Sequence, residues 1–541
     1  MFSAREKRWL CLIAVFYLTA LALSVWLHML PVRDMAHRYI PMAEAFAARD
    51  FRFAFHPRIP PLQPLCGGIV AFFTGADGFL ALKIASALWS VAGGALFCLL
   101  LRETHRDDRW VAAPGTLLYL FFPYMFHMAY SGLRESAKGT ILVLLALALV
   151  KIRRECRAPV GFLLAGIGAG LAALLRAEFF AMGIFCLFVA GVFECERSRF
   201  PWRSAVATLI AAALCFPNIL ANWLFFRTAM PDVRFAELFL RITGRQAGIG
   251  DALLLGAALI LLLPVAARAA ARPLHRINAG YLWLAAFAAT AAVTVFTAMT
   301  GRDRGEPGAV IEHLAVIGKS LYYFVTPVAL VHIGVRIKKK QFTGEEHAVV
   351  LVVGANLLLC VLQGQFFHRT LELSPRYLFP ATPLLLGFFI LSVRDLYRGF
   401  LLFLPRPLVN LMLLAAWIGV AVMYCYHAPQ PLFREYHHPR RLAERRFIDE
   451  TTEIIAGDYR GPGIAAPRRS LWHYSSRRRP MVWFDNTTKI TVSACLAGGS
   501  LSRSLRDADY AVSVKRPRRK GIRVVGRVSD GHHNYTIWRM R

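Results

Sequence analysis

The stretch "REKRWLCLIAVFYLTALALSVWLHMLPVRD", residues 5–34, decides the class of fold. Its apolar run from Trp9 to Leu30 is long enough to cross the hydrocarbon core of a bilayer as a helix. The run is long for the apolar core of a secretory signal, and no clean small-residue cleavage site precedes "PVRD". We therefore expect a retained first span that follows a basic, cytoplasmic N-terminus.

Similar apolar runs recur along the 541-residue chain, which is 57% hydrophobic and 18% charged, with a mean hydropathy of +0.46. A soluble protein of this length would carry more charge and divide into several domains. The sequence thus predicts an α-helical polytopic membrane protein, with a transmembrane domain over residues 1–432. The net charge of +31 is scattered between apolar segments, which argues against a nucleic-acid partner. The ten cysteines imply no disulfide framework.

Short basic clusters alternate with the apolar runs and predict the topology, because such clusters face the cytoplasm. The clusters are 102–109, 151–157, 194–203, 268–276, 336–340 and 394–398. The segments expected to face outward are 31–66, 127–138, the turn around Arg176, 227–250, 301–320 and 363–377. With the N-terminus inside and the tail outside, this scheme predicts about 13 transmembrane helices.

The C-terminal segment, residues 433–541, has a different pattern. A helical stripe is formed by Leu442, Phe447, Ile448, Ile454 and Ile455. Short β-like runs follow at 481–484, 510–514, 522–528 and 535–540. We therefore predict a small soluble α/β domain, which an odd number of spans places on the extracytoplasmic side.

The first outward loop, residues 31–66, is long and contains interfacial features. An apolar stripe at helical spacing, suited to the membrane interface, is formed by Met35, Tyr39, Met42 and Phe46. Asp34 and Arg38 lie one turn apart on another face, and Pro41 predicts a kink or two short helices. Two interpretations of Asp34 stay open locally: a helix N-cap, or a carboxylate near the bilayer that acts as a base.

Charged residues border several later spans, where they are costly and usually functional. The charged candidates are Arg134 and Glu135, Arg176 and Glu178, and Arg376, which the neutral candidate Tyr377 follows directly. For each Arg–Glu couple, a structural ion pair is the alternative. The outward segments hold many arginines, which favours a phosphate-bearing ligand as much as simple contact with lipid headgroups.

Several kinds of site are absent from the sequence. It contains no Walker loop, no G-x-G-x-x-G loop, no H-E-x-x-H motif and no C-x-x-C motif. A transferred group would therefore not come from a nucleotide bound in the cytoplasm. No pair of histidines has metal-ligand spacing, so we expect neither a metal nor another cofactor.

Four segments together resemble the GT-C superfamily of membrane glycosyltransferases, and within it the protein-mannosyltransferase and aminoarabinose-transferase branch. They are the carboxylate loop after the first span, "HPRIPPLQPL" (56–65), "LRES" (133–136) and "SPRYLFPATPLL" (374–385). Members transfer a sugar from a polyprenyl-phosphate carrier to an extracytoplasmic acceptor. The resemblance implies that Asp34 is the general base or orients the acceptor. Its other implied site residues are Tyr39, Pro60, Pro61, Arg376 and Tyr377.

The predicted function is therefore inverting glycosyl transfer at a bacterial-type inner membrane. The partners would be a polyprenyl-phosphate-linked sugar, membrane lipids and an extracytoplasmic lipid, glycan or protein acceptor. The departing phosphate needs cationic donors, for which the candidates are Arg58, Arg176, Arg376 and either Arg241 or Arg245. A transporter or flippase is the alternative, but it predicts repeated halves with charges near the midplane. An O-antigen ligase or polymerase predicts its longest outward loop late in the chain.

Overall fold

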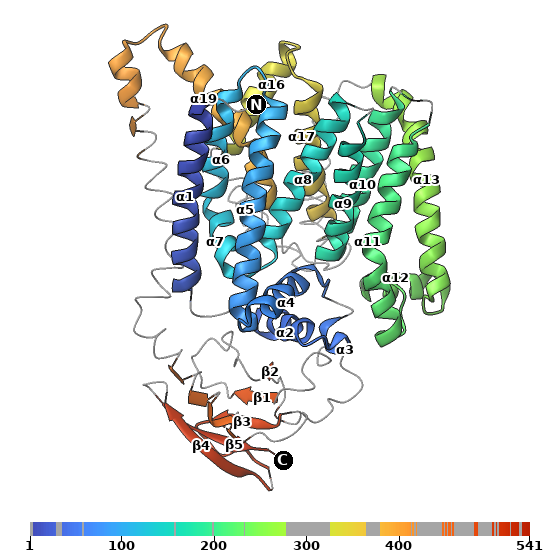
Figure 1. Ribbon diagram of the computed structural model, residues 1–541, viewed down its shortest axis with the longest axis vertical. Coiled ribbons are helices and arrows are strands. Elements are labelled where there is room, and N and C mark those ends of the chain that lie inside the picture. The colour runs from blue at the N-terminus through green and yellow to red at the C-terminus, as the bar shows by residue number, and fades with distance from the viewer. Residues whose placement is uncertain are drawn as a thin grey trace, which may run out of the picture. The chain divides into compact units, whose positions relative to one another are not determined.

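The computed structural model divides the chain into two compact units (Figure 1). The first unit comprises Met1–Tyr17, Trp89–Phe126 and Glu135–Tyr424, and the second comprises Leu18–Leu88, His127–Arg134 and Cys425–Arg541. The residues described are 4–28, 35–56, 59–155, 158–196, 198, 200–231, 233–276, 325–363, 379–412, 414–415, 418, 446–447, 450–451, 453–455, 457–458, 481–484, 500–501, 505, 508–519, 521–529 and 533–540.

The first unit is a helical bundle. Its elements are α1 (Ala4–Leu27), α5 (Gly78–Thr104), η2 (Arg109–Val111), α6 (Ala112–Leu120), α7 (Pro123–Ser131), α8 (Glu135–Arg154), α9 (Pro159–Leu175), α10 (Ala177–Cys195), α11 (Trp202–Phe226), α12 (Val233–Thr243), α13 (Ile249–Arg276), α16 (Val325–Lys338), α17 (Gly344–Gln363), η4 (Phe379–Leu385) and α19 (Leu386–Phe400). Three of these helices, α1, α5 and α7, also contribute residues to the second unit.

Four of the described helices are long and apolar enough to cross a membrane. They span Glu6–Leu27, Gly78–Thr104, Trp202–Phe226 and Ile249–Ala271. Three shorter apolar helices span Leu62–Thr74, Pro159–Leu175 and Phe179–Cys195. The predicted helical architecture is therefore confirmed, whereas the count of about 13 spans stays a prediction.

Helix α8 is the centre of this bundle. Its run "TILVLLALALV" is apolar on every face, and each residue from Glu135 to Val150 is buried. Glycines bring the neighbouring helices close. A Cβ on Gly166 of α9 would lie 2.6 Å from the carbonyl oxygen of Ala207 in α11, and one on Gly183 of α10 would lie 3.0 Å from Ala169. Such small residues allow backbones to approach within a membrane.

One end of the bundle, at the top of Figure 1, holds the basic clusters together through ion pairs. Glu103 of α5 accepts a hydrogen bond from Lys151 of α8 (3.3 Å) and another from Arg154. Two further pairs join the cluster regions, Arg153 with Glu196 and Arg394 with Asp108. The clusters around 102–109, 151–157, 194–203 and 394–398 therefore meet at this end.

The remaining two clusters reach the same end. Glu346, in the first turn of α17, lies 3.2 Å from Arg336 and 3.6 Å from His105. Val192 in the last part of α10 packs against Ala267 and Ala271 of α13, which brings 268–276 alongside. The grouping of all six predicted clusters is thus confirmed. Their assignment to the cytoplasmic side stays a prediction.

The membrane-associated part of the second unit contains short helices that pack on one another. They are η1 (Met35–Tyr39, a π-helix), α2 (Ile40–Ala47), α3 (Phe51–Ala54) and α4 (Leu62–Thr74). The π-helix η1 continues directly into α2 at Ile40, and Pro41 occupies the first turn of α2, so the predicted kink or division into two short helices is not observed. Prolines are tolerated there because the first helical N–H groups have no partner within the helix.

The apolar stripe packs on protein, and the placement of its helices at the membrane interface stays a prediction. Its members face protein instead of lipid, with exposures of 0% for Met35, 4% for Tyr39, 0% for Met42 and 8% for Phe46. The reason is that α2 packs directly on α4 across two glycines. A Cβ on Gly68 would lie 2.4 Å from Cβ of Phe46, and one on Gly67 would lie 3.3 Å from Cβ of Ala43.

This close packing gives a stability prediction. Gly68→Leu is expected to destabilise the protein by about 1–3 kcal/mol, because its Cβ would also meet the Ala43 carbonyl oxygen at 2.8 Å, and backbone yields little. Thermal unfolding in detergent would measure the change. Gly334→Leu in α16 is the control, since a Cβ there meets nothing within 4 Å. Equal midpoints for the two variants would contradict the tight α2–α4 contact.

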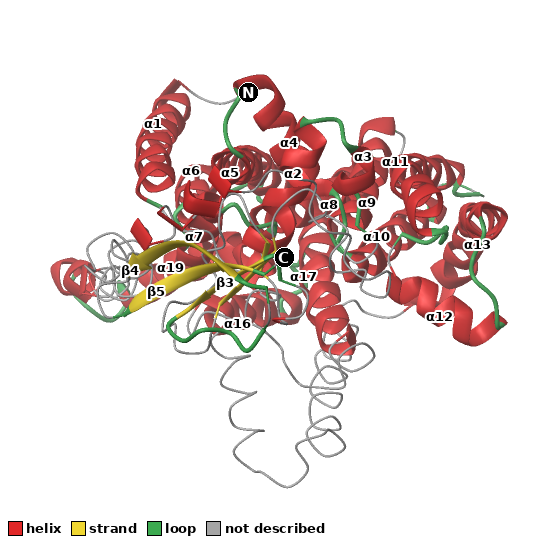
Figure 2. Ribbon diagram, turned by 90° about the horizontal axis from the view of Figure 1, so that it is seen from below, coloured by secondary structure: helices red, strands yellow, loops and turns green. Residues whose placement is uncertain are grey.

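The C-terminal segment forms a five-stranded sheet (Figure 2). The strands are β1 (Met481–Phe484), β2 (Ser500–Leu501), β3 (Tyr510–Ser513), β4 (Arg523–Ser529) and β5 (Asn534–Arg539), in the order β2-β1-β3-β5-β4. β1 pairs in parallel with β2 and β3, while β5 is antiparallel to β3 and β4. The four predicted strands are confirmed, and β2 is an addition.

The two faces of this sheet bury different groups. On one face, Tyr535 and Ile537 pack with Phe447 and Ile455 of the predicted helical stripe. Leu442 and Ile448 of that stripe lie outside the described residues. On the other face, Ala511 and Met540 pack with Trp538. The domain boundary at 432/433 stays a prediction.

Candidate functional site

The predicted site residues fall into three groups. Those outside the described residues are Asp34, Arg58, Arg376 and Tyr377. Those described in the second unit are Arg38, Tyr39, Pro60, Pro61 and Arg134, and those in the first unit are Glu135, Arg176 and Glu178. For Glu178 the structure describes only the backbone, which is helical within α10. Each unit is therefore considered by itself.

Glu135 begins α8 at the end of the bundle opposite the ion-paired clusters. Helix α8 has 20 residues, so about 30 Å separate its two ends. The Glu135 side chain is only 3% exposed, and its negative charge suits the positive N-terminal pole of the helix. Its Oε2 atom has no hydrogen-bond partner within the described part of the chain. A carboxylate oxygen that is buried without a hydrogen-bond partner costs free energy, and such an oxygen is typical of a site that receives a ligand.

Arg176 lies between α9 and α10 and is 7% exposed. Its extended backbone (φ −165°, ψ 138°) ends one helix and begins the next. Its carbonyl oxygen accepts the amide N–H groups of Phe179 (3.0 Å) and Phe180 (3.2 Å). The first turn of α10 is thereby fixed to the residue that carries the buried guanidinium.

Lys138 is a buried cation that the sequence analysis missed. It is 5% exposed, and its Nζ atom lies 5.1 Å from the ring centroid of Phe179, a cation–π contact. The only sequence signal was its place three residues after Glu135, on the same face of the helix. Lys138 and Arg176 thus border the same turn of α10, and we call these two residues the cationic turn.

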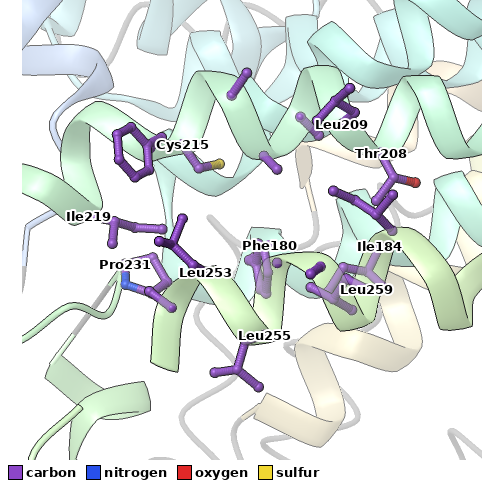
Figure 3. A pocket seen from close by; sticks show the side chains of 18 of the residues that line it. Phe180, Ile184, Thr208, Leu209, Cys215, Ile219, Pro231, Leu253, Leu255 and Leu259 are labelled. Carbon is purple, nitrogen blue, oxygen red and sulfur yellow. The ribbon is translucent and has the colours of Figure 1, made fainter. Parts of the chain in front are cut away.

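An apolar cavity of about 540 Å³ lies beside this turn (Figure 3). Its walls come mainly from α10, α11 and α13, and the segment 229–231 with Phe235 of α12 contributes at one end. Two polar side chains line it, and both bond to backbone: Thr208 donates to Ser204 O (2.9 Å), and Cys215 donates to Gly170 O (3.8 Å). The cavity therefore suits an apolar occupant.

The first helical turn of α10 lies between the cavity and the two residues of the cationic turn, Lys138 and Arg176. Phe179 contacts Lys138, whereas the adjacent Phe180 lines the cavity and meets the ring of Phe235 at 5.7 Å. The cavity also opens at the bundle surface. Its partly exposed lining residues are Leu209 (54%), Phe216 (39%), Leu253 (56%) and Leu255 (47%). A lipid chain could enter from the side, because α11 and α13 are both long enough to span a membrane.

Two other arginines proposed as phosphate donors lie elsewhere. Arg245 donates to both carboxylate oxygens of Asp251, at 2.6 and 2.7 Å, and its side chain is 62% exposed. This pair joins the loop after α12 to the start of α13, so Arg245 has a structural role there. Arg241, on α12, is exposed.

In the second unit, two predicted motifs are brought together. Gln63, from the "HPRIPPLQPL" run, donates to Gly132 O (3.0 Å) and Ser86 Oγ (2.9 Å). Ser86 in turn donates to Leu133 O (2.9 Å), in the "LRES" turn. Pro60 and Pro61 are buried just before α4. This network positions Arg134, which is half-buried, and sequence reasoning identified neither Gln63 nor Ser86.

Both flanks of Asp34 are anchored in the same unit. Lys83 is 5% exposed and donates to Val25 O (2.7 Å) and His28 O (2.9 Å), so its ammonium stabilises the C-terminal end of α1. On the other flank, Met35 is fully buried against Gly132, whose φ of +78° excludes most side chains. Tyr39 is buried and Arg38 is half-buried in the turn that follows.

Metal-ligating side chains do not gather in the portion of the chain that the structure describes. No group of three His, Cys, Asp or Glu side chains there is close enough to hold a metal ion. The expectation that the protein needs no metal or other cofactor stays a prediction.

No family model matches the chain, and no curated protein matches it in sequence. Some solved structures resemble the chain in fold. The oligosaccharyltransferase of Archaeoglobus fulgidus, in complex with zinc and sulfate, is 13% identical over 92% of this chain and 67% of its own, with a TM-score of 0.51. ArnT from Cupriavidus metallidurans, bound to undecaprenyl phosphate, is 13% identical over 99% of this chain and 98% of its own, with a TM-score of 0.43. The likeness to the oligosaccharyltransferase shows that the two chains share a fold.

Proposed function

We propose that the protein is an inverting glycosyltransferase that moves a sugar from a polyprenyl-phosphate carrier to an acceptor outside the cytoplasm. The observation that supports it most is the contact between the cationic turn and the apolar cavity through one turn of α10. A polyprenyl phosphate has the matching composition, with an anionic head and a long apolar chain. The GT-C fold is compatible with this chemistry.

The cationic turn would bind the phosphate. In a single displacement, the bond between the anomeric carbon and the phosphate oxygen breaks, and negative charge develops on that oxygen. The buried Arg176 and Lys138 side chains would stabilise this charge more strongly than exposed cations, because little water screens them.

The cavity would bind the part of the carrier next to the phosphate. Its volume of about 540 Å³ lies within the range of small-molecule sites. Inside a bilayer, a prenyl chain gains little from leaving lipid, since both surroundings are apolar. Shape and packing would therefore decide which carrier binds, and the remainder of the chain would extend through the lateral opening into lipid.

Asp34 would activate the acceptor from the opposite face of the sugar. The acceptor oxygen would bond to the anomeric carbon while its proton passes to the Asp34 carboxylate, which gives inversion. Where the acceptor is already an anion, Asp34 would orient it instead. The described residues on either side, His28 and Met35, are both held by contacts within the second unit.

The proposed location is the inner membrane. The six basic clusters would face the cytoplasm, in accord with their positive charge. The end that carries Glu135 and Arg176, together with the C-terminal domain, would then face outward.

Transfer by the purified chain in nanodiscs would test this function, with radiolabelled sugars on polyprenyl phosphates of different lengths. Gly256→Leu would fill the cavity, because a Cβ on this lining residue of α13 meets nothing within 4 Å. We expect it to raise KM for long carriers about tenfold, the loss of about 1.4 kcal/mol in binding. A soluble sugar phosphate without a prenyl chain should be unaffected.

Gly250→Leu, also on α13 and equally unobstructed but outside the cavity lining, is the matched control. Equal kinetics for both variants would remove the cavity from the donor site. Failure of folded wild-type protein to release polyprenyl phosphate from any donor would reject the function itself. Movement of the lipid-linked sugar across the bilayer without transfer would support a flippase.

A further inference from the structure

The connection between β3 and β4 is densely basic. Five of the six residues in "KRPRRK", 515–520, are lysine or arginine. Strands β3 and β4 both pair with β5, which lies between them, so the connection 514–522 must cross from one side of β5 to the other. This crossover is described except at Lys520.

The crossover is held on the sheet by its own side chains. Pro517 is buried, and Ile522 packs with Trp538 in the cluster on that face. The Arg516 guanidinium lies 6.0 Å from the Trp538 ring centroid, and Arg519 Nη1 donates to Leu505 O (3.5 Å). The positive charges are therefore displayed from a fixed position and do not belong to a solvated tail.

The acidic groups of the described sheet do not neutralise this charge. Asp458 binds Arg523 (2.5 Å) and Arg539 (3.2 Å). Burial raises the pKa of Tyr510, so its hydroxyl stays protonated and donates to Asp458 as well (2.8 Å). Asp509 is 8% exposed. Among the described ion pairs, none involves a cation of the crossover.

Aliphatic side chains accompany the exposed cations. Lys515, Arg516 and Arg518 are exposed, and they are flanked by Val514 (39% exposed) and Val524 (49% exposed). Basic residues interspersed with exposed apolar ones are typical of surfaces that lie at the headgroup layer of a membrane. We call these five residues the cationic crossover surface.

We propose that the cationic crossover surface docks the C-terminal domain on anionic phospholipid headgroups. The same chain contains helices that can span a membrane, so the domain meets headgroups at a high effective concentration. Each cation near an anionic bilayer multiplies the equilibrium constant for docking roughly fivefold, and the three exposed cations therefore give a factor on the order of 100. Exposed valines favour a lipid surface over a purely polar polyanion.

Hydrogen–deuterium exchange of the full-length chain in nanodiscs would test the proposal. We expect amides of 514–522 to exchange about tenfold more slowly with roughly 30% phosphatidylglycerol than with phosphatidylcholine alone. About 0.5 M salt should abolish the difference, because exposed charges are then screened. The combined variant Lys515→Ser, Arg516→Ser, Arg518→Ser should lose it as well.

Arg527→Ser, which removes an exposed cation of β4 outside this surface, should keep the full difference. Protection of the β5 amides 535–538 would show that each variant is folded. Equal exchange of 514–522 in the two kinds of nanodisc would overturn the proposal. Protection that appears only when a soluble anionic glycan is added would overturn it too, and would assign the surface to a glycan.

Discussion

Arg176→Met is expected to lower kcat for sugar transfer by about 10²- to 10³-fold, with a smaller effect on KM for the donor. The reason is that the buried guanidinium would stabilise charge that develops as the phosphate departs, and removal of one such donor typically has this effect. Methionine fills much of the buried space and carries no charge of its own. Single-turnover release of polyprenyl phosphate would measure the chemical step.

Two variants make this result specific. Lys138→Met should also lower kcat, and the double variant should lose less than the product of the two single effects, because both cations would act on one phosphate. Arg245→Met is the matched control, since that arginine is exposed and paired with Asp251. An unchanged kcat in Arg176→Met, with thermal unfolding like that of wild type, would contradict the assignment of the phosphate site.

Asp34→Asn is expected to lower transfer by about 10²- to 10⁴-fold, the usual contribution of a general base. This substitution separates the two interpretations that the local sequence leaves open. Asparagine caps a helix about as well as aspartate but does not accept the acceptor's proton. A pure cap would therefore leave the transfer rate unchanged, whereas a base would not.

Asp77→Asn supplies the control for the capping interpretation. The Asp77 carboxylate accepts the amide N–H groups of Phe79 (2.8 Å) and Leu80 (3.0 Å), so it caps the start of α5. We expect this variant to transfer sugar at the wild-type rate. Asp34→Glu should recover part of the lost activity. Wild-type kinetics in Asp34→Asn would contradict the role of Asp34 as the base. They would not bear on the assignment of the cavity and the cationic turn to the donor.

The comparison of sequence with structure is most instructive for the first outward loop. The spacing of Met35, Tyr39, Met42 and Phe46 correctly indicated helical structure with one apolar face. It did not reveal that the face packs on protein. Lipid tails and a buried α4 are equally apolar, so the pattern is the same for both neighbours. Gly67 and Gly68 decide between them, since their lack of side chains lets α4 approach α2.

The candidate site was only partly predictable for a related reason. Glu135 and Arg176 were found because a charge at the border of an apolar run is locally conspicuous. Lys138 was not found from the sequence, because its burial depends on the approach of Phe179 from another helix. The hydrogen bonds of Gln63 and Ser86 likewise join segments that are distant in the chain.

The sequence by itself determined the apolar helices, the grouping of six basic clusters and the strands of the C-terminal sheet, because hydropathy, charge and periodicity act locally. Tertiary structure alone decided which helices enclose the apolar cavity, which cations become buried beside it and which face of the sheet the basic crossover covers. These features depend on close packing between distant segments, where a few glycines and one turn of α10 set the distances.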